Sequence, residues 1–348
     1  MQYGYIKPKL FILGNKRFQD LSELYEVRHA NQKAIIEQTG FSGDIGEYFT
    51  RIDFQPDILF ITDESLPPMY RGLENLTIPV VGYLIDTHLH FSWHKHFAHV
   101  FDHCFIAQKK YFQDISSTCS HCSLLSLFAP GDMSTNVSRD IDICFLGTLN
   151  AKLNPERVKF IESFKQLHPL TVASGPYKEL FNRSRIILNQ AVIDDINFRV
   201  FEAMACGGML LTDSIGNGLN EMFIDGTHLV LYEKGNASDA VNKAIHYLAN
   251  EQSRQRIALA GHLQTVCRHT EKNRILTVHK EFQKLLASGK TDMVSRVIAL
   301  KQTYTALVSI FDHSLDKMAL KELYNLLNEE LICKSALNEG LAAKGTSI

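Results

Sequence analysis

The chain has 348 residues, of which 45% are hydrophobic and 21% are charged, and this profile is typical of a globular protein. A formal net charge of −2 excludes a global basic field of the kind that attracts nucleic acid or anionic membranes. The length favours two domains, since it exceeds what one ordinary hydrophobic core supports.

The sequence also bears on the compartment. No apolar run approaches the ~20 residues that a membrane-spanning helix needs, and the first residues lack the pattern of a signal peptide. The seven cysteines are irregularly spaced, which favours a reducing compartment over a disulfide framework. We therefore expect a cytoplasmic protein with no transmembrane segment and no nucleic-acid partner.

Short apolar runs in the first third of the chain predict strands that are buried on both faces. They are LFILG at Leu10, ILFIT at Ile58, PVVGYL at Pro79 and CFIAQ at Cys104. The segment between the first two runs, residues 17–38, is compatible with helix. Strands that alternate with helices predict a doubly wound parallel sheet, so residues 1–135 are expected to form a Rossmann-like domain.

A turn-rich stretch, APGDMSTNVSRD (residues 129–140), is the candidate linker. After it the alternation restarts with the apolar runs IDICFLG, LTVAS, IILNQ, MLLTD and HLVLYE. Residues 136–290 are therefore expected to form a second Rossmann-like domain. Two such domains facing each other across a cleft would bind ligand beyond the carboxyl ends of their strands.

Helical patterns dominate from about residue 236 onward. The residues Val297, Leu300, Tyr304, Leu307 and Phe311 repeat at helical spacing and mark one apolar face. A second helix would carry the stripe Leu320, Leu323, Leu327 and Leu331, with Asp316 as its cap. We expect residues 291–348 to form a helical hairpin appended to the second domain, ending in a loose tail (340–348), and this hairpin is a candidate surface for a homo-oligomer.

The stretch NFRVFEAMACGGMLLTD, residues 197–213, reads as a helix that two glycines end before a buried strand. The helix would begin near Asn197, where its free amides and the positive end of its dipole suit a phosphate or diphosphate. Glu202 lies in its first two turns, where a carboxylate can accept hydrogen bonds from two ribose hydroxyls. Asp194, in the preceding loop, is placed to reach sugar hydroxyls. The alternative for Glu202 is a solvated helix carboxylate.

This stretch, an acid followed seven residues later by Glu-Ala-Met-Ala-x-Gly, resembles the signature of retaining glycosyltransferases of the GT-B architecture, group 1 (family 4). The variant found here, followed by NEMFIDGTHLVLYE, is most similar to the spore-maturation (CgeB-like) branch. The segments DICFLGTLN, LFNRSRIILN and RIALAGHLQTVCRHTEKNRILTV also fit that branch. The resemblance covers about residues 141–286, whereas the N-terminal third matches only in architecture.

The resemblance implies a GT-B fold, retention of anomeric configuration and no obligatory metal. It implies that Glu202 binds the donor ribose and that Asp194 takes the place of the family's first acid, which contacts the transferred sugar. That acid is usually glutamate, and the neighbouring Asp195 is equally acidic and could take the role.

For the diphosphate, the resemblance implies that Gly147 and Thr148 line the site. Arg199 or Arg183 would supply the neutralising cation. The basic pair that many group 1 enzymes keep earlier in the second domain is not recognisable in this sequence.

A histidine-rich stretch, GYLIDTHLHFSWHKHFAHVFDH (residues 82–103), follows the third predicted strand. In the resembled family a His or Asp from this loop lies near the reacting sugar, so Asp86 and His88 are candidate catalytic residues. The histidines between His88 and His103 also raise the possibility of zinc, but no paired spacing supplies a third and fourth ligand convincingly. Surface or packing histidines are the other interpretation.

The motif CSHC, from Cys119 to Cys122, is a lone Cys-x-x-Cys. It has no second pair for a zinc ribbon and no thioredoxin-like setting for redox chemistry. We therefore interpret these cysteines as incidental and expect no bound metal.

The sequence thus predicts a glycosyltransferase that moves a sugar from a nucleotide donor to a hydroxyl of a glycan or protein acceptor, without a cofactor. A UDP-sugar is the expected donor. Two alternatives stay open. An epimerase or hydrolase acting on the nucleotide sugar would share the donor site and need no acceptor. A non-catalytic sugar-nucleotide-binding scaffold would bind nucleotide without turnover.

Overall fold

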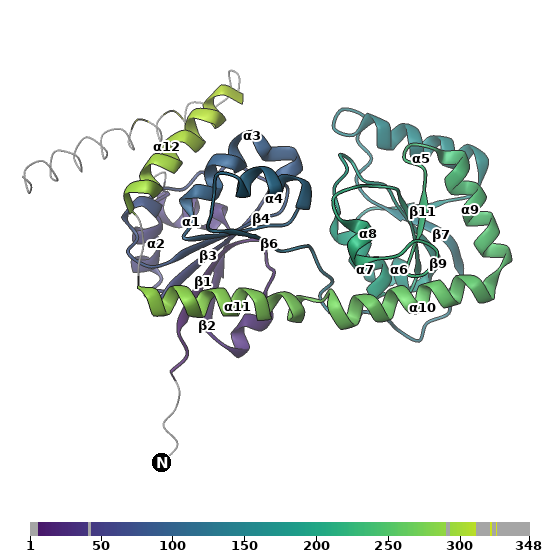
Figure 1. The fold of residues 1–348 in the computed structure, drawn as a ribbon, viewed down its shortest axis with the longest axis horizontal. Helices are drawn as coiled ribbons and strands as arrows, with labels where there is room; N and C mark the ends of the chain where they lie inside the picture. Colours follow the sequence, from purple (N-terminus) through teal and green to yellow (C-terminus); the bar gives the residue numbers. More distant parts are fainter. Residues whose placement is uncertain (1–5, 41–42, 290–292, 311–320, 322–324, 326–348) are drawn as a thin grey trace, which may run out of the picture. The chain divides into compact units, whose positions relative to one another are not determined.

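The structure, a computed structural model, describes residues 6–40, 43–289 and 293–310, together with Lys321 and Asn325. The chain divides into two compact α/β units (Figure 1). The first comprises residues 1–107, 111–124 and 279–348, and the second comprises residues 108–110 and 125–278. None of the described helices combines the length and the apolar character that crossing a bilayer takes.

The first unit is built on a parallel sheet with the strand order β2-β1-β3-β4-β5-β6. The strands are β1 (Lys9–Gly14), β2 (Glu26–Ala30), β3 (Ile58–Thr62), β4 (Val80–Leu84), β5 (His103–Ile106) and β6 (Cys122–Leu124). Every residue of β3 and β4 is buried, as expected of central strands with both faces covered. The four strands predicted from apolar runs are confirmed as β1, β3, β4 and β5.

The prediction of helix over residues 17–38 is wrong in its middle. The segment forms a 3₁₀ helix, η1 (Gln19–Glu23), then the strand β2, and then α1 (Gln32–Thr39). β2 carries Glu26 and Arg28, both exposed. An edge strand tolerates such residues because part of it faces water, and their presence hid the strand from a search for apolar runs.

Helices of the first unit pack against this sheet and close its core. They are α1, α2 (Ile45–Arg51), α3 (Thr87–Phe97), α4 (Lys109–Ser116), α12 (Met293–Ile310) and the 3₁₀ helices η3 (Leu73–Asn75) and η4 (Ala98–Val100). One buried cluster joins strand residues such as Phe11 and Leu59 to Trp93 of α3 and Leu300 of α12. On the other face, Phe60 of β3 packs edge-on against Phe282 of α11 (Glu271–Ser288), with ring centroids 5.3 Å apart.

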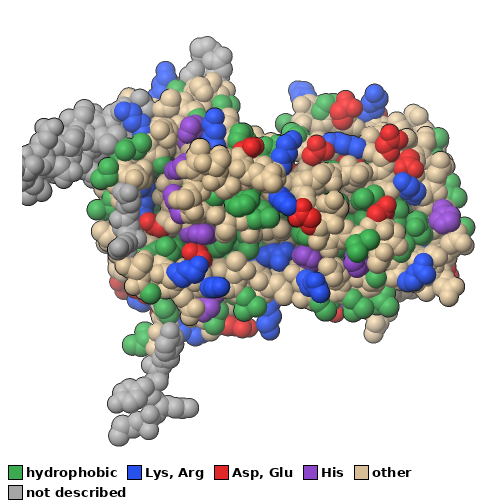
Figure 2. All heavy atoms as spheres, viewed as in Figure 1, with side chains coloured by type: hydrophobic (Ala, Val, Ile, Leu, Met, Phe, Trp, Pro, Cys, Tyr) green, Lys and Arg blue, Asp and Glu red, His purple; other side chains and the backbone are tan. Residues whose placement is uncertain are grey.

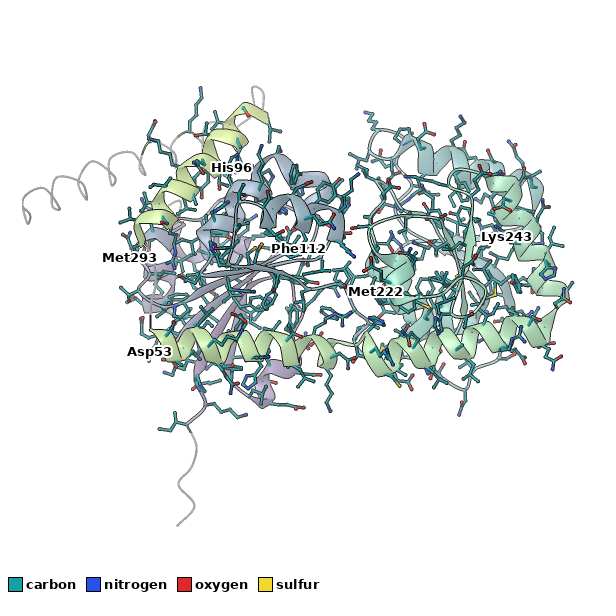
Figure 3. The ribbon with its side chains drawn as sticks, in the orientation of Figure 1. Asp53, His96, Phe112, Met222, Lys243 and Met293 are labelled. Carbon is teal, nitrogen blue, oxygen red and sulfur yellow. The ribbon has the colours of Figure 1, made fainter. Side chains whose placement is uncertain are left out.

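α12, whose first residue Met293 is labelled in Figure 3, confirms the predicted apolar stripe over its described part. Val297, Leu300, Tyr304 and Leu307 are all buried. The expectation that the hairpin extends the second domain is wrong for α12, because α12 packs on α3, η3 and η4 of the first unit. The stripe on α12 is therefore covered within the chain itself.

Several expectations for the C-terminal region lie outside the described residues. These are the fifth member of the first stripe, the second helix with its cap and stripe, and the tail, that is, Phe311, Asp316, Leu320, Leu323, Leu327, Leu331 and residues 340–348. A homo-oligomer through the C-terminal helices stays a prediction.

The second unit is built on a parallel sheet with the order β11-β10-β9-β7-β8. Its strands are β7 (Ile141–Leu146), β8 (Thr171–Ala173), β9 (Ser184–Asn189), β10 (Met209–Asp213) and β11 (Val230–Tyr232). They confirm the five strands predicted after the turn-rich stretch. The helices are α5 (Pro155–Leu167), α6 (Lys178–Arg183), α7 (Phe198–Ala205), α8 (Leu219–Met222), α9 (Ala237–Ala249) and α10 (Glu251–Arg268).

Two helix layers enclose this sheet. α5 and α9 contact each other and share a core with alternate strand residues such as Phe145 and Leu188. α7 and α10 contact each other and β10. The sheet is therefore buried on both faces, and its carboxyl edge is where loops and helix starts converge.

The boundary between the units lies earlier than the predicted position at residue 135. Ala129 exchanges backbone hydrogen bonds with the second unit, donating to His269 O (2.9 Å) and accepting from Glu271 N (2.8 Å). Arg139, in the predicted linker, donates to Phe181 O (2.9 Å) and Cys206 O (2.6 Å). The turn-rich stretch is thus fastened to the second unit, and its composition reflects tight turns rather than a free connection.

Candidate functional site

α7 begins at the carboxyl edge of the second sheet, in the loop that follows β9. Its body is apolar and buried, which fixes it between the sheet and α10. Two glycines end it for different reasons. Gly207 has a φ of +72°, which side chains disfavour, and a Cβ on Gly208 would come within 2.5 Å of Ile187 Cδ1. The prediction that two glycines end this helix before a buried strand is confirmed, since the chain passes from them directly into β10.

Asn197 is the N-cap residue of α7, with extended backbone angles and no side-chain capping bond. Its side-chain Oδ1 and Nδ2 are both buried, and neither has a hydrogen-bond partner in the described part of the chain. A buried amide with both ends unsatisfied is costly unless a ligand or water completes it. Such an amide at a helix start, beside amides that favour anions, is what a phosphate-bearing ligand would complete.

Arg199, in the first turn of α7, brings a cation to the same edge. Its Nε donates weakly to Asn189 Oδ1 at 3.4 Å, and no described carboxylate forms an ion pair with it. Burial lowers the pKa of its guanidinium, while the nearby carboxylates of Asp195 and Glu202 oppose that shift. An ideal Cβ on Gly147 would lie 3.6 Å from Arg199 Nη1, so the structure brings these two predicted residues together.

Glu202 lies one turn after Arg199 on α7 and is only 9% exposed. The alternative of a solvated helix carboxylate therefore does not hold. The Glu202 carboxylate is a buried charge that acts on the Arg199 guanidinium, rather than a surface charge. Whether its oxygens receive ribose hydroxyls stays a prediction.

Asp194 has a φ of +50° and a half-exposed carboxylate, which forms an ion pair with Lys234 Nζ. Its carbonyl oxygen accepts a hydrogen bond from Asn217 Nδ2 at 3.2 Å. The sequence analysis missed Lys234, although this residue directly follows the predicted strand HLVLYE. The first acid of the motif is thus paired with a cation that reaches the same edge from β11.

Asp195 plays a structural part, unlike the alternative role suggested for it. Its Oδ1 accepts hydrogen bonds from Val192 N (2.9 Å) and Ile193 N (3.4 Å), and the residue is buried. A carboxylate that closes the turn before α7 in this way is not free to turn toward a sugar. Its charge is still felt by Arg199.

Asp213 and Arg157 also gather at this edge, and sequence reasoning missed both. Asp213, at the end of β10, accepts from Ala191 N at 3.0 Å, and burial raises its pKa to about 6. Arg157, on α5, donates to Gln190 Oε1 (2.9 Å) and Gln190 O (2.7 Å), and burial lowers its pKa to about 10. Both groups hold the chain that leads from β9 to α7.

Arg183 does not belong to this site, which corrects its choice as a diphosphate cation. It ends α6 immediately before β9 and therefore lies at the amino edge of a parallel sheet, opposite the carboxyl edge. There it forms a bidentate pair with Asp140, which precedes β7 (3.0 and 2.6 Å). Thr148, by contrast, follows Gly147 after β7 at the carboxyl edge and is exposed.

The first unit has a polar cluster of its own at its carboxyl edge. Asp86 is the N-cap residue of α3, two residues after β4, and a hydrogen bond joins its side chain to Ser65. Ser65 Oγ lies 3.0 Å from His90 Nε2. Burial, followed by the nearby Asp63, raises the pKa of Asp86. His88 Nδ1 is buried and has no hydrogen-bond partner among the described residues.

Two buried groups support this cluster from beneath. Asp63 Oδ2 accepts from the backbone amides of Ile85 (3.0 Å) and Asp86 (2.8 Å), which fixes the start of α3. His94 lies 3.8 Å from the same carboxylate, and complete burial holds its pKa well below its usual range. The placement of Asp86 and His88 after a strand end is confirmed, while their catalytic role stays a prediction.

The part of the chain that matches a known family lies almost entirely in the second unit. Residues 138–280 match a family model described as glycosyl transferase-like. No curated protein matches the sequence. Among solved structures, HepE of Anabaena in complex with UDP-glucose aligns with a TM-score of 0.58 at 12% identity, over 81% of this chain and 100% of HepE.

Two further structures give the same result. Sucrose-phosphate synthase from Thermosynechococcus elongatus aligns with a TM-score of 0.59 at 10% identity, over 81% of this chain and 100% of the synthase. TarM of S. aureus aligns with a TM-score of 0.53 at 9% identity, over 68% of this chain and 57% of TarM. The predicted fold is confirmed: the chain has the GT-B architecture of two parallel α/β domains with C-terminal helices.

Proposed function

We propose that this protein transfers a sugar from a nucleoside diphosphate sugar to a hydroxyl acceptor. The observation that carries the proposal is the start of α7. There the side-chain amide of Asn197 is buried without a partner among the described residues, and Arg199 Nη1 lies 3.6 Å from the position of a Cβ on Gly147. This constellation lies inside the segment that matches the glycosyl transferase-like family model. UDP is the nucleotide we favour, since HepE was solved with UDP-glucose on the same fold.

In this proposal each residue of the site has a separate task. The N-terminal end of α7 and Arg199 neutralise the diphosphate, because a guanidinium offers a planar fork of donors to phosphate oxygens. Gly147 and Thr148 form the backbone wall beside it, and Glu202 accepts the ribose hydroxyls. The same donors stabilise the charge that grows on the departing diphosphate.

The pair of Asp194 and Lys234 is proposed to act on the transferred sugar. Its ionic contact is half exposed, so a sugar hydroxyl can compete for the carboxylate at modest cost. Because Arg199 and the helix end supply positive charge, we propose that no divalent metal is needed for transfer. Retention of anomeric configuration and membership of the spore-maturation branch are proposed on the sequence resemblance.

For the first unit we propose that the cluster of Asp86, Ser65, His88 and His90 binds the acceptor. A carboxyl whose pKa is raised by burial holds a proton more readily than a solvated one, which suits an exchange with a hydroxyl. The cytoplasm, with glycan or protein acceptors, is proposed as the setting of the reaction.

A thermal-shift screen of the full chain with UDP, ADP, GDP and their sugar conjugates tests the donor site. A ligand at 100 times its Kd stabilises the protein by about 2.7 kcal/mol, which is readily measured as a rise in Tm. We expect UDP and at least one UDP-sugar to raise Tm while ADP does not. A screen in which no nucleoside diphosphate raises Tm would contradict the proposal.

The products formed with the best donor then separate the alternatives. Transfer predicts UDP release that depends on an added glycan or protein acceptor. Sugar release or isomer formation without an acceptor indicates a hydrolase or epimerase. Binding with no turnover of any donor indicates a scaffold protein.

A further inference from the structure

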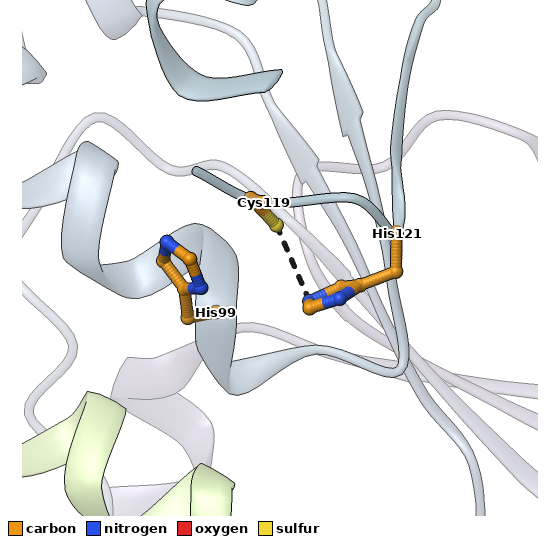
Figure 4. A group of neighbouring side chains, drawn as sticks. All are labelled: His99, Cys119 and His121. Atoms are coloured by element: carbon orange, nitrogen blue, oxygen red, sulfur yellow. Dashed lines mark hydrogen bonds between the residues drawn. The ribbon is translucent and has the colours of Figure 1, made fainter. Parts of the chain in front are cut away.

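Three side chains of types that bind metals meet beside the edge strand of the first unit (Figure 4). His99 lies on η4, while Cys119 and His121 lie in the turn between α4 and β6. One candidate ligand atom from each of the three lies within 4.8 Å of the other two. Figure 2 shows further histidine side chains on the drawn face of this unit, but among the described residues only these three form such a group.

The separations suit a tetrahedral ion. Two ligands that each lie 2.0–2.3 Å from zinc stand about 3.3–3.8 Å apart. Cys119 Sγ and His121 Nε2 are 3.3 Å apart, which already meets this requirement. His99 is partly exposed, so its ring has room to turn by the remaining distance, about 1 Å.

The chemistry of the side chains also suits a metal. A neutral imidazole keeps a lone pair that can bind an ion, and each of the two histidines brings a ring nitrogen to the group. Cys119 is buried, and its Sγ lies 3.8 Å from Ala98 O and 3.3 Å from His121 Nε2. Binding would exchange the thiol proton for the ion, so affinity should rise with pH.

The surroundings provide both support and access. A hydrogen bond joins the His121 ring to the backbone of Ala98, and the Asp102 carboxylate acts on the same ring. Outer contacts of this kind orient histidine ligands in metal sites. His99 and His121 also line a solvent-open groove with Thr77, Asp102 and Ser288, which gives an ion a path to them.

We propose that His99, Cys119 and His121 bind one Zn²⁺ ion, with water in the fourth position, and that this ion fastens β6 to η4. β6 has three half-buried residues, and among the described strands it pairs with β5 alone, so its own packing holds it weakly. The chain leaves the first unit directly after β6, and a metal clip at this point would hold the strand in place. The inference is independent of the proposed transfer reaction.

The competing chemistry is a disulfide between Cys119 and Cys122. The two thiols are close, since a side-chain hydrogen bond joins them, and Cys122 Sγ also donates to Cys119 O at 2.9 Å. A Cys-x-x-Cys pair of this kind can oxidise. Zinc and a disulfide exclude each other at Cys119, because only a thiolate binds the ion. Metal content and the thiol state therefore decide between them.

The test uses the full chain, stripped with a chelator under reducing conditions and then titrated with zinc alone. We expect one zinc per chain and a higher Tm. Co²⁺ should give visible absorption of a tetrahedral site with a thiolate-to-metal band. His99→Gln, His121→Gln and Cys119→Ala should each weaken zinc binding by at least about tenfold, and Cys119→Ala should also abolish the thiolate band.

His96→Gln is the matched control, because His96 lies on α3 close in sequence to His99 but outside the group (Figure 3). It should bind zinc like the parent. Circular dichroism of each variant separates a lost ligand from a lost fold, and His99→Gln is the safest variant because His99 is partly exposed. The proposal is overturned by a folded parent that takes up no stoichiometric zinc, by variants that bind as the parent does, or by a Cys119–Cys122 disulfide that persists in reducing buffer.

Discussion

Arg199 and Gly147 approach each other at the carboxyl edge of the second sheet, with Arg199 Nη1 lying 3.6 Å from the position of a Cβ on Gly147. That Cβ would also stand 3.0 Å from Phe145 Cζ, which leaves little room for a side chain. Because Gly147 has no side chain, a ligand can approach the backbone after β7 beside the Arg199 guanidinium. A diphosphate can therefore contact backbone and guanidinium together.

The first prediction contrasts Arg199 with Arg183. Arg199→Gln removes a charge-assisted contact worth roughly 1.5–3 kcal/mol, so UDP affinity should fall by about ten- to a hundredfold. Arg183→Gln removes the same charge from the opposite edge of the sheet, where Arg183 pairs with Asp140. UDP affinity of that variant should equal the parent's in isothermal titration calorimetry. Equal losses from both variants would mean that general charge, not the site, attracts the nucleotide.

The second prediction separates the two acids of the motif. Glu202→Gln exchanges one acceptor oxygen for a donor and removes the charge, so affinity for UDP and for UDP-sugar should fall by about ten- to a hundredfold. Asp194→Asn should leave UDP affinity unchanged and lower turnover, because the proposed contact of Asp194 is with the sugar alone.

Stability measurements make this comparison sharper. Glu202 is buried and adjoins Arg199, so Glu202→Gln should also lower the free energy of unfolding, unlike a change at a solvated carboxylate. Lys234→Gln is the control for Asp194, since it breaks the same ion pair from the other side. If both acid variants bind UDP like the parent, the donor-site assignment is wrong.

Metal independence of transfer gives the third prediction. Protein stripped with a chelator and resupplied with zinc alone should transfer sugar at the same rate with or without added Mg²⁺ or Mn²⁺. The reason is that Arg199 and the start of α7 already supply the positive charge that a metal would bring. A strict requirement for Mg²⁺ or Mn²⁺ in initial-rate assays would contradict this.

The fourth prediction concerns pH and Asp213. Burial raises its pKa from 3.8 to about 6 in the folded chain, so the folded state holds the proton more tightly than the unfolded state. Ionised Asp213 therefore costs stability above pH 6, and the cost disappears as pH falls toward 4. Asp213→Asn keeps an acceptor for Ala191 N and should be more stable than the parent at pH 7.5, by up to about 3 kcal/mol.

The advantage of Asp213→Asn should shrink toward zero as pH falls to 4, because Asp213 of the parent is then protonated in the folded state and approaches protonation in the unfolded state. Measuring the variant against the parent cancels the opposite trend of His269, whose pKa is lowered to about 4 by burial. Urea unfolding followed by circular dichroism from pH 4 to 8 provides the comparison. A difference that stays constant over this range would show that Asp213 does not titrate in the folded protein.

The sequence alone was sufficient to locate strands whose residues are all apolar, because such residues indicate burial directly. Central strands such as β3 and β4 are apolar throughout, so they could be located without knowing their neighbours. The edge strands β2 and β6 could not, since water on one side removes the apolar signal. The pattern of α12 was recognised, but its attachment to the first unit depends on contacts with residues about two hundred positions earlier.

The same limit applies to the site. Arg199, Glu202 and Asn197 share one helix, so their common location followed from local sequence. The pairing of Asp194 with Lys234 spans 40 residues and depends on where β11 ends. Arg183 was assigned to the wrong edge of the sheet. A residue before a strand can be assigned to the amino or the carboxyl edge only when the directions of the strands are known. The meeting of His99 with Cys119 and His121 likewise arises from packing, not from motif spacing.

The last prediction concerns Arg296, a fully buried cation on α12. It donates to Val100 O (3.2 Å), Leu73 O (3.0 Å) and Leu76 O (3.0 Å), and forms an ion pair with Asp102 Oδ2 at 2.7 Å. Arg296→Met leaves these acceptors without their donor and Asp102 without its cation. Removing one partner of a buried pair costs about 3–5 kcal/mol.

The loss from Arg296→Met should be confined to the first unit and can be observed there selectively. Trp93 is the only tryptophan of the chain and lies in the core of that unit, so its fluorescence reports unfolding of the first unit. The urea midpoint by Trp93 fluorescence should fall sharply, whereas Val294→Ala, on the exposed side of α12, should leave it unchanged. UDP affinity should survive, because the proposed nucleotide site belongs to the second unit. A folded Arg296→Met variant that no longer binds UDP would mean that the first unit helps to form the nucleotide site.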